Sequence, residues 1–157
     1  MAEFYEATAA RLTRLLVVAG AGRRDAEDLT QEAFVRLIPR WERISRYEDP
    51  EAWVRSVAMR LWISRTRRTA VARRGLTRLR SLPAAHEQEH DPVTLVVAEA
   101  LATLPAQQRV VVVLHHLLDL SVEQVAAELK IPPGTVKSRL SRARDTLRPL
   151  LEETSHA

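Results

Sequence analysis

The sequence predicts an all-α protein made of two small helical domains joined by a linker. Three observations favour this fold class. Apolar residues recur at helical spacing along almost the whole chain, the alternation typical of strands is scarce, and only four glycines occur among 157 residues. A chain of this length can form one ordinary domain or two small ones. Because 46% of the residues are hydrophobic, each domain can bury a core.

Helix-start signals set the expected elements. Asp25 precedes an amphipathic run, Asp49 precedes a proline at a first helical position, and Asp91 repeats the Asp-Pro pattern. Ser121 and Gln124 have the spacing of a capping box. We therefore expect helices at 2–19, 25–38, 50–68, 93–103, 106–118, 121–129 and 135–148.

A polar stretch between the third and fourth expected helices divides the chain. Residues 69–91 contain Gly75, Pro83 and the polar run from His86 to His90. We expect a first domain at 1–74, a linker at 75–92 and a second domain at 93–157. Charge follows a similar division, because the net charge is +5 over 1–74, −2 over 75–103 and +1 over 104–157.

The basic residues are almost all arginines. Of 24 basic residues only Lys130 and Lys137 are lysines, and the net charge is +4. Arginine suits bidentate contacts to phosphates and bases better than lysine does, so this composition agrees with a nucleic-acid partner. The chain has no cysteine, which excludes disulfides and thiolate metal sites.

Nothing in the sequence predicts secretion or a membrane span. Met1–Gly20 carries charged residues among its apolar positions, unlike a signal peptide. Apolar runs such as Val110–Leu114 are far shorter than the ~20 residues that span a bilayer. We therefore expect a soluble, cytoplasmic protein.

The C-terminal part carries a helix-turn-helix pattern. A short helix after Ser121 is followed by the turn Lys130–Gly134 and by a second helix from Thr135 to Leu147. On a helical wheel one stripe of the second helix is apolar: Val136, Leu140, Ala143 and Leu147. The opposite side carries hydroxyls and cations, which can contact base edges and phosphates in a major groove.

Three segments of this half resemble region 4 of the sigma-70 superfamily, specifically of the extracytoplasmic-function type. They are the runs Leu104–Leu114, Leu120–Ala126 and Pro133–Arg144. In that family the domain reads the −35 promoter element, and the resemblance implies contacts by Lys137, Ser138, Arg139, Ser141 and Arg142. Thr135 joins this set because it lies at the helix start, where free N–H groups favour a phosphate. Arg139 lies toward the side of the DNA-facing surface, where we expect it to contact a phosphate.

Two other readings of this half are open. One is an amphipathic helix whose Arg/Ser face is merely solvated. The other arises because related helix-turn-helix modules occur in response regulators, so this half alone does not settle the function.

The run Asp25–Ile38 resembles the part of sigma region 2 that grips RNA polymerase. The wheel independently predicts a buried stripe of Ala26, Leu29, Ala33 and Leu37. The far side mixes acids, an amide and exposed β-branched residues, which is unusual for a solvated helix. In the family the partner is the coiled-coil clamp of the largest polymerase subunit. We expect the docking residues to be Asp28, Gln31, Glu32, Val35 and Ile38. The alternative is that their own domain covers Val35 and Ile38.

The run Asp49–Arg68 resembles the segment that reads and melts the −10 element. The wheel predicts a core stripe of Trp53, Val54, Val57 and Leu61. It places Arg55, Met59, Trp62 and Thr66 away from that stripe. Aromatic rings with arginines suit a melted strand, because bases stack on rings while cations track phosphates. The candidate −10 contacts are Arg55, Arg60, Trp62, Arg65, Arg67 and Arg68.

Alternatives and departures remain within this segment. Trp62 is balanced between a core-edge position and a stacking platform, and the terminal arginines also fit a solvated helix end. Many family members have Asn at the place of Arg60 and Asp at the place of Ser64, so the −10 preference is open.

Other kinds of site receive no support. His86 and His90 have helical metal-ligand spacing, but they stand in a polar stretch without an obvious third ligand. His115 and His116 are adjacent and are expected on different faces of a helix. There is no Gly-rich phosphate loop, and no arrangement of catalytic residues. We expect no enzyme activity, no metal and no cofactor.

Together these patterns predict a sigma factor that docks on core RNA polymerase and recognises the −10 and −35 elements of promoter DNA. The main alternative is a stand-alone helix-turn-helix regulator that binds duplex DNA as a dimer. A weaker one is an interaction protein that mimics a sigma domain to sequester an anti-sigma factor. An anti-sigma factor is also a possible partner of the sigma factor itself, which we expect to be a monomer when free.

Overall fold

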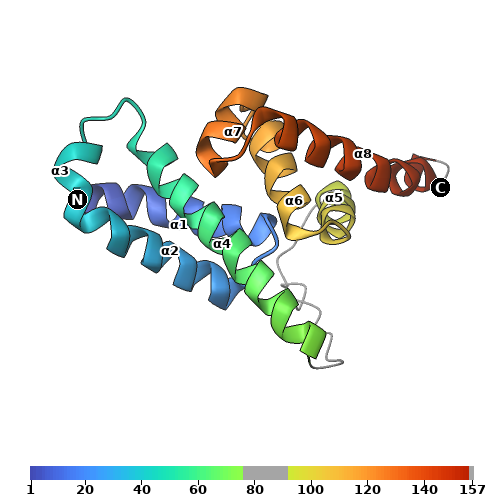
Figure 1. The fold of residues 1–157 in the computed structure, drawn as a ribbon, viewed down its shortest axis with the longest axis horizontal. Helices are drawn as coiled ribbons and strands as arrows, with labels where there is room; N and C mark the ends of the chain where they lie inside the picture. The colour runs from blue at the N-terminus through green and yellow to red at the C-terminus, as the bar shows by residue number, and fades with distance from the viewer. Residues whose placement is uncertain (76–91, 156–157) are drawn as a thin grey trace. The chain divides into compact units, whose positions relative to one another are not determined.

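The computed structural model describes residues 1–75 and 92–155, and every regular element in these ranges is helical. The chain divides into two compact units, Met1–Ala84 and Ala85–Ala157, each with its own core (Figure 1). The predicted linker at 75–92 lies, except for its ends, outside the described residues, and its bounds stay a prediction.

The N-terminal domain is built on three long helices. They are α1 (Ala2–Val18), α2 (Arg23–Leu37) and α4 (Pro50–Gly75); η1 (Ile38–Arg40) and α3 (Trp41–Ile44) connect α2 to α4. Each long helix packs against the other two (Figure 1). The largest fully buried side chains of this domain are Leu16, Leu29, Leu37, Ile44, Val54 and Met59. Both α1 and α2 therefore pack against α4, and these contacts fix its position in the domain.

Local sequence explains where these helices begin and end. Gly20 has φ 112°, a conformation that only glycine adopts readily, and it reverses the chain after α1. Asp49 caps α4 as predicted, since its Oδ1 accepts a hydrogen bond from the Ala52 N–H at 3.0 Å. Asp25 is not the cap of α2, which begins at Arg23 after an N-cap at Gly22. The side chain of Asp25 pairs with Arg65 instead.

The predicted core stripe of α4 was too narrow. Val54, Val57 and Leu61 are buried as expected, whereas Trp53 is only half-buried. Met59, placed on the far side by the wheel, is fully buried. The physical reason is that α4 contacts both α1 and α2, so its buried surface is wider than one stripe.

The C-terminal domain packs four helices and a π-helical turn. They are α5 (Pro92–Ala102), α6 (Ala106–Val112), η2 (Val113–Leu117), α7 (Val122–Leu129) and α8 (Pro133–Ser155). α8 packs against α5, α6 and α7. The core of this domain holds Val110, Val111, Val113, Leu114, Val125 and Val136. The helix predicted at 106–118 is thus two elements, α6 and η2.

The helix-turn-helix is present, with a turn that differs from the predicted one. The capping box of Ser121 and Gln124 is confirmed in both directions. The residue with a left-handed backbone is Lys130, at φ 55° and ψ 48°, which ends α7. Gly134 is not part of the turn but of the first turn of α8, because Pro133 starts that helix.

Candidate docking and nucleic-acid interfaces

The predicted −35 residues lie on the outer face of α8. Val136, Leu140 and Ala143 are buried against the domain, as the wheel predicts, while Leu147 is half-buried. Of the predicted contacts, Lys137, Ser138, Ser141 and Arg142 are exposed, while Thr135 and Arg139 are half-buried. The Ser138 hydroxyl donates to the Gly134 carbonyl oxygen at 3.3 Å, so its lone pairs remain available as acceptors. The first three turns of α8 therefore present hydroxyls and cations together.

The outer face of α2 is exposed along its length. The inward stripe of Ala26, Leu29, Ala33 and Leu37 is fully buried, as predicted. Val35 and Ile38 are 62% and 61% exposed, which excludes the alternative that their own domain covers them. Asp28 and Gln31 are exposed beside them, and Gln31 Nε2 donates to the Tyr5 hydroxyl. This face thus combines two apolar side chains with polar groups held in place.

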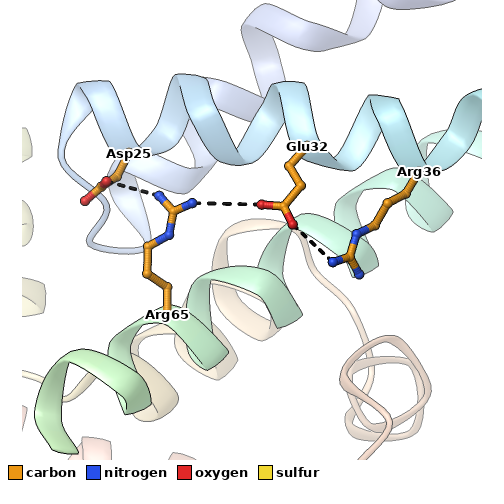
Figure 2. Close-up of polar contacts among 4 residues, drawn as sticks. All are labelled: Asp25, Glu32, Arg36 and Arg65. Atoms are coloured by element: carbon orange, nitrogen blue, oxygen red, sulfur yellow. Dashed lines mark hydrogen bonds and ion pairs between the residues drawn. The ribbon is translucent and has the colours of Figure 1, made fainter. Parts of the chain in front are cut away.

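Glu32 belongs to a chain of ion pairs that joins α2 to α4 (Figure 2). Its Oε1 lies 3.1 Å from Arg36 Nη2, and its Oε2 lies 3.9 Å from Arg65 Nη2. The other guanidinium nitrogen of Arg65, Nη1, lies 3.1 Å from Asp25 Oδ1. Arg65 was predicted as a −10 contact, and its cation is engaged with two carboxylates of α2.

The remaining predicted −10 residues differ in exposure. Arg67 and Arg68 are exposed, whereas Arg55, Arg60 and Trp62 are half-buried. The indole N–H of Trp62 donates to the Ala19 carbonyl oxygen at 3.0 Å, which places this ring at the core edge of the fold. Burial lowers the pKa of the Arg60 guanidinium below its usual value, and the nearby charge of Arg36 lowers it further. The guanidinium still carries its charge, at a desolvation cost.

Two features were not singled out from the sequence. Tyr47 is 45% exposed in the segment between α3 and α4, next to Arg46. An aromatic residue with arginines nearby was the pattern that indicated binding of a melted strand by α4, and Tyr47 and Arg46 show the same pattern.

The second feature is a cavity of about 540 Å³ between α6, η2 and α8. It is lined by Val112, His116, Leu140, Arg144, Leu147, Arg148, Leu151, Glu152 and Ser155. Apolar residues at helical spacing continue past the predicted helix end at 148, through Leu150 and Leu151, and this pattern could have shown that α8 is longer.

His115 and His116, the two histidines within the described ranges, lie side by side. The rings of His115 and His116 meet edge to face with centroids 4.7 Å apart. The expectation that the two side chains point to different faces of a helix, away from each other, was therefore wrong. His115 Nδ1 lies 2.7 Å from the Leu120 carbonyl oxygen. Within the described ranges no group of three or more potential ligands gathers; His86 and His90 lie outside those ranges. Over those ranges, too, no helix is long and apolar enough to cross a membrane.

Both halves match known family models. Residues 4–71 match the model for Sigma-70 region 2, and residues 94–147 match the model for Sigma-70, region 4. The two matches contain every residue that was predicted to dock or to bind DNA.

Curated relatives agree over most of the chain. The RNA polymerase sigma-E factor of Streptomyces antibioticus is 37% identical over 82% of this chain and 71% of its own length. The ECF RNA polymerase sigma factor SigL of Mycobacterium tuberculosis is 33% identical over 98% and 89%. The ECF RNA polymerase sigma factor SigE of Mycolicibacterium smegmatis is 31% identical over 92% of this chain, which spans 59% of that longer relative.

A solved structure supports the fold. The sigma factor RpoE of Bartonella quintana, solved with the anti-sigma factor NepR, superposes with a TM-score of 0.75 at 23% identity. The match covers 96% of this chain and 95% of that one. With both regions matched and relatives above 30% identity, the chain belongs to the extracytoplasmic-function sigma factors of RNA polymerase, which direct the enzyme to promoters.

Proposed function

We propose that this chain docks on core RNA polymerase through α2 and reads promoter DNA through α4 and α8. The observation that carries the docking assignment is the exposure of Val35 and Ile38 beside Asp28 and Gln31. β-branched side chains this exposed on a well-packed helix are typical of a protein-binding surface. The proposed partner surface is the coiled-coil clamp of the largest polymerase subunit.

The proposed −35 reader is the N-terminal half of α8. Lys137, Arg139 and Arg142 provide cations for phosphates or guanine edges, and Ser138 and Ser141 provide hydroxyls for base edges. Free N–H groups at the helix start, near Thr135, favour a phosphate.

The proposed −10 reader is α4, with Arg67 and Arg68 as its exposed cations. Half-buried Arg55 and Arg60 have less freedom to follow a strand, and Trp62 is tied to Ala19. We therefore weight this assignment toward the C-terminal end of α4, where a displaced strand can be tracked by cations.

The chain acts in this proposal without enzymatic chemistry of its own, and in the cytoplasm, where RNA polymerase works. An anti-sigma factor is a further proposed partner, since RpoE of Bartonella quintana was solved in complex with one.

The test is run-off transcription with purified core polymerase over a promoter library, with and without the chain. We expect specific initiation that requires both. Arg142→Ala should reduce initiation at −35-dependent promoters, while core affinity stays unchanged. Val35→Asp with Ile38→Asp should abolish core binding. The matched control is Val97→Asp on α5, another exposed apolar position.

A different result would point to the rival function. If the chain never binds core polymerase but binds a defined palindromic duplex as a dimer, it is a stand-alone regulator. The double aspartate variant would then leave duplex binding intact.

A further inference from the structure

The contacts of Arg65 place it with the docking helix. It stands on α4, but its guanidinium reaches across to α2 and meets two carboxylates, those of Asp25 and Glu32 (Figure 2). Asp25 and Glu32 are seven residues apart, two helical turns, so both face α4 from the same side of α2. The two terminal nitrogens of a planar guanidinium, Nη1 and Nη2, hold two such groups in a fixed fork, which the single nitrogen of an ammonium does not provide.

The side chain of Arg65 is also partly withdrawn from solvent. It is 31% exposed, against 53% for Arg36, the other arginine that holds Glu32. A DNA phosphate would compete for Arg65 with carboxylates that lie 3.1 and 3.9 Å away. Arg67 and Arg68, two and three residues further on, are exposed and carry the same charge. For a phosphate they are the more accessible cations on this helix.

Glu32 is in turn held from two sides. Arg36 lies at one carboxylate oxygen and Arg65 at the other. Asp25, Glu32, Arg36 and Arg65 together carry no net charge, so this part of the docking face offers an oriented carboxylate and no net attraction. Fixing a flexible glutamate before binding reduces the entropy lost when a partner immobilises it.

We propose that Arg65 is a positioning residue of the polymerase-docking surface, which holds the Glu32 carboxylate in its binding orientation. This inference rests on the proposed function and deepens it. It assigns Arg65 to docking instead of to −10 recognition. The partner group that meets Glu32 is a hydrogen-bond donor of the polymerase aligned with the fixed carboxylate.

The experiment is a double-mutant cycle on core polymerase affinity. The variants of the full chain are Arg65→Gln, Glu32→Gln and the two combined. We expect Arg65→Gln to weaken core binding about 3–10-fold, the effect of freeing one long side chain. In the Glu32→Gln background the same change should have no further effect, because the group that Arg65 orients is gone.

Two further variants separate orientation from charge and from stability. Arg65→Lys keeps the charge but cannot bridge both carboxylates, so we expect it to weaken core binding as Arg65→Gln does. The matched control is Arg23→Gln, which breaks another arginine–glutamate pair of α2, Arg23–Glu27 at 3.2 Å, with no expected change in core affinity. Thermal unfolding of every variant is measured beside the affinity, since a purely structural role would lower the melting temperature without coupling to Glu32.

Each remaining outcome overturns the inference. Core affinity that is unchanged in Arg65→Gln, with promoter opening reduced, would make Arg65 a DNA contact. Affinity that rises in Arg65→Gln would mean that net negative charge, not orientation, drives docking. If the wild-type chain fails to bind core polymerase, the proposed function fails; if Glu32→Gln weakens binding and Arg65→Gln does not, only this inference fails.

Discussion

At the scale of single residues, Trp62 links α4 to the end of α1 through one hydrogen bond. Its indole N–H donates to the carbonyl oxygen of fully buried Ala19 at 3.0 Å. Trp62→Phe keeps an aromatic ring but leaves that carbonyl without its donor. We expect the free energy of unfolding to fall by about 1–3 kcal/mol, measured by urea denaturation.

The control for this prediction is Trp41→Phe. The ring of Trp41 contacts Phe4, and its indole makes no hydrogen bond within the described part of the chain. Both changes shrink a ring, but only one removes a buried hydrogen bond. Equal losses of stability in the two variants would contradict a specific role of the Trp62 N–H.

We expect His116 to make the stability of the C-terminal domain sensitive to acid. Its side chain is exposed, but partial desolvation lowers the pKa of the imidazole, and the neighbouring charges of His115 and Arg144 lower it further. Arg148 and Glu152 line the same cavity. The unfolded chain then binds the proton more readily than the folded one, so stability falls as pH drops through about 6.5 and levels off below the folded pKa.

We therefore expect His116→Gln to reduce the loss of melting temperature between pH 7.5 and pH 5. The measurement is the difference between wild type and variant at each pH, because other groups titrate equally in both. A difference that is constant with pH would show that protonation of His116 does not affect folding.

At the scale of elements, the turn of the helix-turn-helix has a left-handed backbone at Lys130, whereas the nearest glycine, Gly134, lies four residues later. Lys130 holds a left-handed conformation, which costs a non-glycine residue about 1–2 kcal/mol. Gly134 lies inside α8, where a Cβ would meet open space. Lys130→Gly relieves the strained position, and Gly134→Ala improves helix propensity.

We expect Lys130→Gly and Gly134→Ala each to raise the free energy of unfolding by about 0.5–1 kcal/mol, and their effects to add. Thermal or denaturant unfolding checks this. If Gly134→Ala is more stable but loses −35 binding, a phosphate approaches the backbone there; if it is less stable, the assigned helix start at Pro133 is wrong.

At the scale of the whole molecule, we propose that promoter specificity arises from two weak DNA-reading domains carried on one enzyme. Each proposed DNA-reading surface is confined to part of one helix, α4 or α8, and we expect a footprint of this size to bind weakly alone. Tethering converts the second contact into an intramolecular one. We expect affinity for a complete promoter to be about 10²–10⁴-fold higher in the polymerase complex than for the free chain.

Fluorescence anisotropy with a labelled promoter checks this prediction. Scrambling either the −10 or the −35 element should remove most of the increase in affinity seen in the polymerase complex. The same change should have little effect on the affinity of the free chain. A free chain that binds the full promoter as tightly as the complex would contradict the tethering argument.

The helical period predicts the centre of a buried surface but not its width. The predicted stripe of α2 is buried, and so are Val136, Leu140 and Ala143 of α8, but Leu147 is half-buried and α2 also buries Thr30 and Phe34. Met59 was missed in the same way, because the buried surface of α4 is wider than one stripe. The engagement of Arg65 with Asp25 was missed because it joins residues 40 positions apart, and no local pattern encodes such a pair.

One consequence follows from the length of α8. The proposed −35 contacts of α8 end at Arg142, and apart from Leu140 the residues of α8 that line the cavity lie between Arg144 and Ser155. Arg142 and Leu151 are about 14 Å apart along the axis, at 1.5 Å per residue. Promoter preference and the shape of the cavity can therefore diverge independently in evolution. Exchanging only the exposed residues Lys137, Ser138, Ser141 and Arg142 between relatives should transfer the −35 preference and leave the cavity-lining residues of the recipient unaltered.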